Sequence, residues 1–368
     1  MKILTLTTQY ANNMGALLQC YALSKYLNSM NNIECEVIQY LPNGYRRSWT
    51  SFHKPRSFRD FIKLMYEAVR IDLQLVRRRK DKKVRNFISK YIPLTSNKYF
   101  RKDILAIPPQ ADAIIVGSDQ IWNFKLRIDP TYFLDFTTPG TKRISYAASI
   151  ADDWKDEDAK YISPLLNQFD SVSIRERGNL ECLNKVYKKG GTVVCDPVFL
   201  LGKHQWDEIQ ITPKISDPYI FCYFLSVSDM AVEAVNRIRK LTGLKVVHLN
   251  LNTLDKFHSD VEIKDADPSE FIGLIANAQY VCTNSFHCSA FSIIYRRNLT
   301  FVPKHMANER LVQLEDIFGI NVIFNNDKLR SLSLADLKTN YDSAEKGNAF
   351  IDYSKKFLKD SIYGKEND

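Results

Sequence analysis

The chain has 368 residues, of which 45% are hydrophobic and 25% charged, and it contains 13 Gly and 13 Pro. This length fits two domains, and the composition excludes low-complexity, collagen-like and largely disordered proteins. The formal net charge of +9 is unevenly spread, because residues 45–102 hold 18 Lys and Arg against four acidic residues. That segment therefore carries +14 and the rest of the chain −5, so the basic character needs a local explanation.

Strand and helix patterns alternate along the first half of the chain. Strands are expected at 2–8, 34–41, 111–118, 142–149, 170–176 and 192–201, and helices at 17–29, 159–169 and 177–186. The basic insertion at 45–102 interrupts this alternation and fits two helices. Apolar residues from Phe58 to Val76 define the first, and the second is a more charged stretch through Phe87.

The second half restarts the alternation after a hinge region around 202–218. Strands are expected at 218–225, 245–250, 280–285 and 299–304, and helices at 228–243, 267–278, 286–295 and 309–319. The helix at 267–278 has a capping signature, with Asp267 as N-cap, Pro268 in the first turn and Glu270 three residues on. Such alternation in two blocks predicts an α/β fold with two doubly wound, Rossmann-like parallel sheets.

We therefore place one domain at 1–203 and a second at 204–368, the second including a C-terminal helix. Ligands of such sheets bind at the carboxyl ends of strands, so a site is expected in the cleft between the domains.

The start of the chain and its cysteines bear on location. Met1 and Lys2 are followed by a short β-branched run without the length or cleavage site of a signal peptide. No apolar stretch approaches a membrane span of about 20 residues. The seven Cys are scattered and form no CxxC pair, which argues against a disulfide framework or zinc site. We expect a cytoplasmic protein with reduced cysteines.

The segment CTNSFHCSAF contains the strongest candidate for chemistry. The strand pattern ends before Asn284 and Ser285 and the helix pattern begins at Phe286, so His287 falls at a helix N-terminus. Backbone N–H groups and the helix dipole there favour a phosphate or carboxylate, and a His can donate to the anion or carry a proton. Alternatively, Asn284 and Ser285 only cap the helix and His287 packs. The local pattern leaves both interpretations open.

Arg175 follows a short apolar strand directly, in the segment SIRER. At the carboxyl end of a parallel strand it would face the ligand crevice, where a guanidinium can bind a phosphate or carboxylate through two hydrogen bonds. Glu176 can orient it. The alternative is a surface ion pair between Glu176 and Arg177 or a nearby Lys.

A polar turn follows the strand at 111–118, in AIIVGSDQIWN. It lacks the GxGxxG and GK[ST] motifs of nucleotide-binding loops. Ser118, Asp119 and Gln120 can bind sugar hydroxyls, and Trp122 can offer a stacking face. A plain turn with a capping Asp explains the same pattern.

Two further places carry weaker signals. Asn13 and Gly15 lie in a turn after the first strand, where Gly15 would let a ligand approach the backbone. Lys304 ends the last strand pattern and Arg310 opens the next helix, so both can help to neutralise a phosphate. A plain turn and solvated cations are the alternatives. HxxxH, HExxH and GxSxG spacings are absent, and we expect no metal site.

An ordered set of segments resembles the polysaccharide pyruvyl transferase family. The segments are NNMGALLQCYAL, IIVGSDQIWN, YFLDF, ISYAASI, SIRER, CDPVFLL, DPSEFIGLIANA, CTNSFHCSAFSIIY and ERLVQLEDIFG. They span most of the chain, apart from the basic insertion and about thirty C-terminal residues. The family's conserved His falls on His287 and its strand-end Arg on Arg175. Ser285 stands where the family often has Arg, and Cys288 where it often has Gly.

The resemblance implies a GT-B-like fold and transfer of a pyruvyl group from phosphoenolpyruvate to a sugar of a capsular or exopolysaccharide, or to its lipid-linked precursor, forming a ketal. Phosphoenolpyruvate would be a co-substrate, with no further cofactor required. His287 and Arg175 would be catalytic. The second domain would bind the donor and the first the acceptor. The expected donor residues are Arg175, Asn284, Ser285, His287, Lys304 and Arg310, and the acceptor residues Asn13, Gly15, Ser118, Asp119, Gln120 and Trp122.

The basic insertion fits this function if the protein works at the inner face of a membrane. A basic helix pair can lie on anionic headgroups, although a solvated hairpin or one packed on a partner has the same pattern. Nucleic acid is not expected, because no recognised motif accompanies the charge. Two alternatives for the whole protein are a GT-B glycosyltransferase using a nucleotide sugar and a non-catalytic sugar-binding protein, the latter suggested by Ser285.

Overall fold

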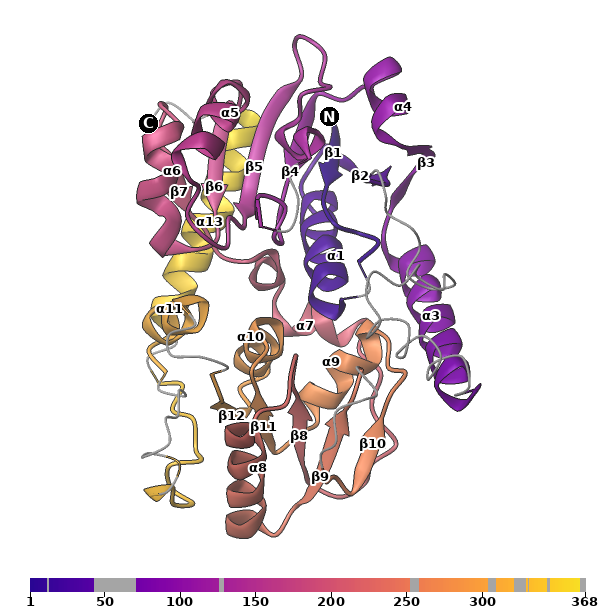
Figure 1. Ribbon diagram of the computed structural model, residues 1–368, viewed down its shortest axis with the longest axis vertical. Helices are drawn as coiled ribbons and strands as arrows, with labels where there is room; N and C mark the ends of the chain where they lie inside the picture. Colours follow the sequence, from indigo (N-terminus) through magenta and orange to yellow (C-terminus); the bar gives the residue numbers. More distant parts are fainter. Residues whose placement is uncertain are drawn as a thin grey trace, which may run out of the picture.

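A computed structural model of the chain describes residues 1–11, 13–42, 71–125, 129–251, 258–303, 309–320, 329, 331–342 and 345–364. Two parallel β-sheets lie one beyond the other along the long axis of the molecule, and both chain termini lie at the end that holds the first sheet (Figure 1). The two sheets fall on either side of residue 203, where the sequence predicted a domain boundary.

The first sheet has seven strands in the order β3-β2-β1-β4-β5-β6-β7, and every pairing in it is parallel. The strands are β1 (Lys2–Leu6), β2 (Glu34–Tyr40), β3 (Leu94–Tyr99), β4 (Ala113–Val116), β5 (Lys142–Ala148), β6 (Ser171–Ile174) and β7 (Thr192–Val193). Because the strands are parallel, the segments that follow β1, β4, β5, β6 and β7 meet at one edge.

The second sheet has five parallel strands in the order β10-β9-β8-β11-β12. They are β8 (Tyr219–Tyr223), β9 (Lys245–Leu249), β10 (Val261–Ile263), β11 (Tyr280–Thr283) and β12 (Asn298–Phe301). Short runs buried on both faces, such as YIFCY in β8, are what a parallel sheet covered on both sides requires.

The remaining elements are helices, and their ends follow the sequence signals. The α-helices are α1 (Met14–Asn28), α3 (Ile71–Tyr91), α4 (Arg101–Ala106), α5 (Asp156–Leu166), α6 (Leu180–Val186), α7 (Lys203–Asp207), α8 (Asp229–Thr242), α9 (Pro268–Ala276), α10 (Phe286–Ile294), α11 (Glu309–Phe318) and α13 (Glu345–Tyr363), and the short 3-10 helices are η1 (Pro130–Phe133), η2 (Arg177–Asn179) and η3 (Pro197–Leu200). The predicted capping box of α9 is present, with Asp267 and Glu270 each accepting the other's backbone N–H. Gly243 ends α8 at φ 70°, a conformation that favours glycine.

Helix α1 is buried along almost its whole length because it lies between the two domains. It packs against η3 and α9, and Leu17, Leu18 and Leu23 are at most 1% exposed. One continuous apolar core runs from the first sheet through α1, η3 and α7 into α9 and α10. This shared core joins the two domains through the helices that lie between the sheets.

The C-terminal helix α13 returns to the first domain, although the sequence placed it with the second. It runs beside β5, β6 and β7 in Figure 1. The buried Ser354 accepts a hydrogen bond from the backbone N–H of Cys195 at 2.9 Å, and Nζ of Lys142 donates to the carbonyl of Ile362 at 2.7 Å. An amphipathic helix pattern cannot indicate which sheet it covers, which explains the difference.

The basic insertion differs from the two helices expected for it. Residues 43–70, which include most of the first expected helix, lie outside the described residues. The second expected stretch forms α3, and the end of the insertion forms β3, an edge strand of the first sheet. Strand β3 was missed because LTSNKY is a short, polar segment whose three central residues are exposed. Among the described residues, no helix is long and apolar enough to span a membrane.

Replacing Ser354 with Ala should lower the free energy of unfolding by about 1–3 kcal/mol, because the buried N–H of Cys195 would lose its acceptor. Thermal or denaturant unfolding measures this. Tyr353→Phe is the matched control, since it removes an exposed hydrogen bond to Thr192 from the same helix and should cost under about 0.5 kcal/mol. Equal losses for the two variants would contradict a buried junction at Ser354.

Candidate functional site

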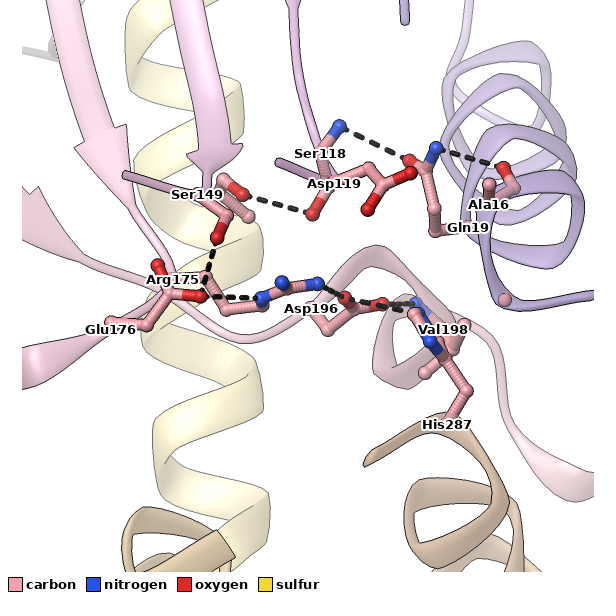
Figure 2. Close-up of polar contacts among 12 residues, drawn as sticks. Ala16, Gln19, Ser118, Asp119, Ser149, Arg175, Glu176, Asp196, Val198 and His287 are labelled. Carbon is pink, nitrogen blue, oxygen red and sulfur yellow. Dashed lines mark hydrogen bonds and ion pairs between the residues drawn. The ribbon is translucent and has the colours of Figure 1, made fainter. Parts of the chain in front are cut away.

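The carboxyl ends of the first sheet meet the N-terminus of α10 at the junction of the domains. Arg175 and Glu176 follow β6, and Asp196 follows β7. His287 rises toward them from the first turn of α10 (Figure 2). The predicted pair of Arg175 and His287 is thus brought together, across a sequence separation of more than a hundred residues, with a carboxylate between them.

Arg175 is buried between two carboxylates. Its Nη1 donates to Oδ2 of Asp196 at 2.7 Å and its Nε to Oε1 of Glu176 at 3.2 Å, and only 4% of its side chain is exposed. The guanidinium carbon lies 5.0 Å from the ring centre of Phe286, a cation–π contact. Burial on its own lowers the pKa of Arg175, but Glu176, Asp196 and Asp119 more than offset this and hold it above its ordinary value.

Asp196 is fully buried and fixed from three sides. It caps η3 by accepting the backbone N–H of Val198 at 3.1 Å, it accepts from Arg175, and its Oδ2 lies 3.5 Å from Nε2 of His287. Burial alone raises the pKa of Asp196, but His287, Arg175 and the Val198 N–H together hold it well below its usual range. The carboxylate is therefore ionised at physiological pH.

His287 is held between Asp196 and α1. Its Nε2 is buried without a hydrogen bond of ordinary geometry to any described residue, and it lies 3.5 Å from Oδ2 of Asp196. The other side of the ring meets Gly15, where an added Cβ would lie 2.0 Å from Nδ1. Gly15 was expected to let a ligand approach the backbone, but in the structure the close neighbour is His287 itself.

A small cavity adjoins this cluster. It has a volume of about 20 Å³, enough for about one water molecule, and Arg175, Asp196, Phe286, Gln313 and Phe318 are among its lining residues. Helix α11 closes one side, since Gln313 donates to the carbonyl of Arg175 at 3.0 Å and accepts from the N–H of Arg177 at 2.9 Å. A substrate larger than a water molecule does not fit this cavity in its present form.

The other residues of the α10 segment are engaged in holding the backbone. Oδ1 of Asn284 accepts from the N–H of Leu225 at 2.7 Å, and its Nδ2 donates to the carbonyl of Ser226 at 2.9 Å. Ser285 is the N-cap of α10 and accepts from the N–H of Cys288. Both are at least nine-tenths buried. In this state they fix the start of α10 and so the position of His287.

The residues predicted to bind the acceptor divide into two groups. Asn13 is exposed and caps α1 through the N–H of Gly15 at 2.9 Å, and Asp119 accepts from the hydroxyl of Thr8 at 2.7 Å. Both lie at the carboxyl edge of the first sheet, as does the partly buried Gln120. Ser118 is fully buried, and its hydroxyl donates to the carbonyl of Ala147, so no solvent-facing group remains on it.

Trp122 does not offer a stacking face to a sugar, which corrects the sequence-based expectation. It is 0% exposed, it stacks on Phe133 with ring centres 5.4 Å apart, and its Nε1 donates to the carbonyl of Tyr132 at 3.0 Å. An indole with both its faces and its N–H satisfied inside the core has nothing left for a ligand.

The remaining predictions concern two cations, a metal site and the cysteines. Lys304 lies outside the described residues, and of Arg310 only the backbone, in α11, is described. The described part of the chain holds no group of three or more His, Cys, Asp or Glu that could bind a metal ion. All seven cysteines are free, and six of them are buried.

Asp196 was missed as a site residue, although the segment CDPVFLL was recognised. The signal that identified Arg175, a charged residue directly after a buried strand in a parallel sheet, applies equally to Asp196 after TVVC. Gln313 had no such signal, because its role depends on where α11 packs. Ser149, whose hydroxyl donates to Oε1 of Glu176 at 2.7 Å, also directly follows a strand, β5, but it carries no charge and so gave a weaker signal.

Comparison with solved structures bears on the fold. The chain is similar to a UDP-GlcNAc 2-epimerase from Methanocaldococcus jannaschii, with 11% sequence identity, a TM-score of 0.50 and coverage of 98% of this chain and 99% of the other. A putative UDP-N-acetylglucosamine 2-epimerase from Listeria monocytogenes gives 10% identity, a TM-score of 0.52 and coverage of 99% and 97%. With its two facing parallel sheets the protein has the GT-B fold.

The family model for polysaccharide pyruvyl transferase matches residues 13–302, which include α1, the carboxyl ends of β2 to β7 and the start of α10. The chain therefore belongs to the polysaccharide pyruvyl transferase family and is a transferase. A comparison with curated proteins gives no match. The family match favours pyruvyl transfer over the two alternatives, a nucleotide-sugar glycosyltransferase and a non-catalytic sugar-binding protein.

Replacing Gly15 with Ala should lower turnover by about 10²-fold, because the new Cβ would displace the His287 ring and a misplacement of about 1 Å can cost this much. Stability should fall little, since a side chain can move and Ala suits a helix better than Gly. Steady-state rates and melting temperatures test this.

Gly202→Ala is the control for the Gly15 variant, because the nearest atom to its added Cβ is a side-chain oxygen 3.8 Å away. It should retain the wild-type rate. A Gly15→Ala enzyme with full turnover would contradict the role assigned to this contact.

Proposed function

We propose that this transferase takes the pyruvyl group from phosphoenolpyruvate and forms a pyruvate ketal on a sugar of a surface polysaccharide or its lipid-linked precursor. The observation that carries the proposal is the place of His287. In a chain of the pyruvyl transferase family, it stands in the first turn of α10, against the carboxyl ends of the other domain's sheet.

The N-terminus of α10 supports an anionic donor. Ser285 caps the N–H of Cys288, whereas the N–H groups of Phe286 and His287 have no hydrogen bond to the described residues. Unpaired N–H groups at a helix start, together with the helix dipole, suit a phosphate or carboxylate. Phosphoenolpyruvate carries both on one small carbon frame.

His287 would act as the proton carrier of the reaction. In the proposed first step it gives a proton to the methylene carbon of phosphoenolpyruvate, which becomes a methyl group and leaves carbon 2 electrophilic. A sugar hydroxyl then bonds to carbon 2 and returns its proton to His287. The bond from carbon 2 to the phosphate oxygen breaks, a second hydroxyl closes the ring, and its proton leaves with the phosphate. The products are a cyclic ketal and inorganic phosphate.

A donor with this much negative charge needs cations beyond Arg175, whose Nε and Nη1 already bind carboxylates. Position 285 is a serine, so the helix start brings no permanently charged cationic side chain. We keep Lys304 and Arg310 as the candidates. Residue 310 lies in α11 one turn before Gln313, which contacts the backbone of Arg175, so a movement of α11 toward a bound donor would bring this region closer.

Phosphate release tests the donor and the histidine together. We expect the wild-type protein to release phosphate from phosphoenolpyruvate in the presence of a lipid-linked sugar acceptor, and to release no nucleotide from nucleotide sugars. His287→Gln should lower the rate by about 10²–10⁴-fold, the usual contribution of a general acid–base group.

His204→Gln is the matched control, because this imidazole is 92% exposed and lies away from the cluster. It should keep the wild-type rate. Nucleotide release from a sugar nucleotide by the wild type, or full activity of a folded His287→Gln protein, would overturn the proposal.

We further propose that the protein works in the cytoplasm, at the inner face of a membrane that carries its acceptor, and that α3 faces the lipid. The inner side of α3 buries the apolar Val84 and Phe87, together with Lys80 and Asp81. Its outer side exposes Arg78, Lys82 and Arg85, and Leu75, at 48% exposed, lies one turn before Arg78. Cations beside an exposed apolar side chain suit an anionic membrane surface.

Part of the basic charge of α3 is engaged within the protein. Nε of Arg79 contacts Asp265 at 2.9 Å, and Lys83 contacts Glu270 at 2.9 Å. These pairs join α3 to the second domain and hold the helix so that Arg78, Lys82 and Arg85 point away from it. These ion pairs lie within the chain and engage one side of α3, and we propose that the other side meets the lipid.

Reversing the charges of Arg78, Lys82 and Arg85 to Glu should weaken binding to vesicles containing anionic lipid by at least about 100-fold, since each cation contributes about 1 kcal/mol near such a surface. Flotation with neutral and anionic vesicles measures this. A control variant with Lys155, Lys160 and Lys188 changed to Glu has the same net charge, and these lysines are also exposed. Equal binding by the two variants, or none by the wild type, would contradict a role for α3.

A further inference from the structure

Five side chains form a continuous polar line from the first sheet to His287 (Figure 2). The hydroxyl of Ser149 donates to Oε1 of Glu176 at 2.7 Å, and the same oxygen accepts from Nε of Arg175 at 3.2 Å. Nη1 of Arg175 donates to Oδ2 of Asp196 at 2.7 Å, and this oxygen lies 3.5 Å from Nε2 of His287. The line begins after β5 and ends on the second domain.

The guanidinium in the middle of this line is poorly placed to bind a donor. Only 4% of the Arg175 side chain is exposed, its Nε and Nη1 each bind a carboxylate, and Phe286 covers a face. The adjoining cavity holds about one water molecule. The two carboxylates also neutralise the charge of this cation, which weakens its attraction for a phosphate.

Asp196 is better placed to act on His287 than any other described carboxylate. Its backbone is set by the end of β7 and by η3, its Oδ1 is held by the N–H of Val198, and its Oδ2 is held by Arg175. A carboxylate fixed in this way can orient an imidazole and stabilise its protonated form. Asp196 faces Nε2 and Gly15 packs on the Nδ1 side of the ring, so the imidazole is held from both sides.

We propose that Asp196 is the positioning residue for His287, and that Arg175 acts through Asp196 instead of binding the donor itself. The proposal rests on the proposed function for the role of His287 as proton carrier. It changes the sequence-based expectation for Arg175, which was a direct grip on the donor anion. In this proposal Arg175 supports the catalytic histidine by holding Asp196 in place.

The charged groups facing the imidazole come from two elements. The segment after β7 contributes Asp196, and the segment after β6 contributes Arg175 and Glu176; Asp119, after β4, acts on Arg175. Helix α1 brings the neutral Gly15, and α11 brings the neutral Gln313 to the backbone of Arg175. With His287 protonated, the two cations Arg175 and His287 balance the two buried carboxylates, which is the arrangement that burial favours.

Asp196→Asn tests this with little change of shape, and the chain offers a matched control. Asp129 occupies an equivalent structural position, because it precedes a proline, caps η1 through the N–H of Thr131 at 3.1 Å, and is buried. Its second oxygen accepts from the hydroxyl of Tyr40 at 2.7 Å, with no histidine beside it among the described residues. Asp129→Asn therefore measures the cost of losing a buried capping carboxylate alone.

The first measurement is a proton NMR titration of the full-length protein labelled at the histidine Cε1 position, with His287 identified from the His287→Gln variant. In Asp196→Asn the His287 signal should titrate at lower pH than in the wild type, because the loss of the neighbouring negative charge disfavours the imidazolium. Asp129→Asn should leave it unchanged. An unchanged midpoint in Asp196→Asn would overturn the positioning role, and this result requires no knowledge of the donor.

The second measurement is the split between kcat and KM for phosphoenolpyruvate. Asp196→Asn should lower kcat by about 10²-fold with KM changed less than about threefold, and Arg175→Gln should do the same. The double variant should be little worse than either single one, as for residues that act as a unit. A raised KM with an unchanged kcat in Arg175→Gln would show direct donor binding and overturn the proposal. If Arg175→Gln does not fold, the NMR titration of His287 in Asp196→Asn tests the positioning role by itself.

The two proposals fail in different ways. If the wild-type protein does not turn over phosphoenolpyruvate but the titration midpoint of His287 moves in Asp196→Asn, the proposed donor is wrong and the positioning role of Asp196 is supported. If phosphoenolpyruvate is turned over but Asp196→Asn keeps the wild-type kcat and the wild-type titration midpoint of His287, the proposed donor is supported and the positioning role of Asp196 is wrong.

Discussion

One arginine is buried between two carboxylates at the edge where the strands of the first sheet end. This cluster constrains the strand ends, η3 and the elements of the second domain that contact it. Removing one partner from such a buried cluster typically costs about 3–5 kcal/mol, because the remaining charge is left buried without its partner. Arg175, Glu176 and Asp196 are therefore stable in the interior only as a set. Their positions are fixed by strand ends, by η3 and by the hydrogen bonds of Gln313. The second domain contributes Phe286 and His287 to the same cluster.

The junction of the domains is therefore both a core and a site. Helix α1 carries the apolar surface that joins the two sheets, and its single glycine at the contact point accommodates the imidazole of His287. Closure of α11 over Arg175 leaves a cavity for about one water. Exclusion of water strengthens every charge in the cluster, and entry of a substrate must separate surfaces that are packed here. Binding and domain movement are coupled in such an arrangement.

The return of α13 to the first domain ties the C-terminal part of the chain to the strand that carries Asp196. Ser354 holds the backbone of Cys195, the residue before Asp196, and Phe350 lines the cavity. The last helix thus supports the site, although it lies outside the residues matched by the family model. The chain therefore leaves the second domain before its last helix, which packs on the first domain.

The sequence by itself determined the alternation of strands and helices, the parallel character of both sheets, the family, and the positions of Arg175 and His287 at a strand end and a helix start. These are local properties, since buried strands, helix caps and strand-end charges are read over a few residues. It did not identify Asp196 as their link, the fully buried state of Trp122, the role of Gly15 beside His287, or the sheet that α13 covers. Each of these depends on which segments pack together across long sequence separations, and only the tertiary structure decides that, because the same amphipathic pattern or turn is compatible with many neighbours.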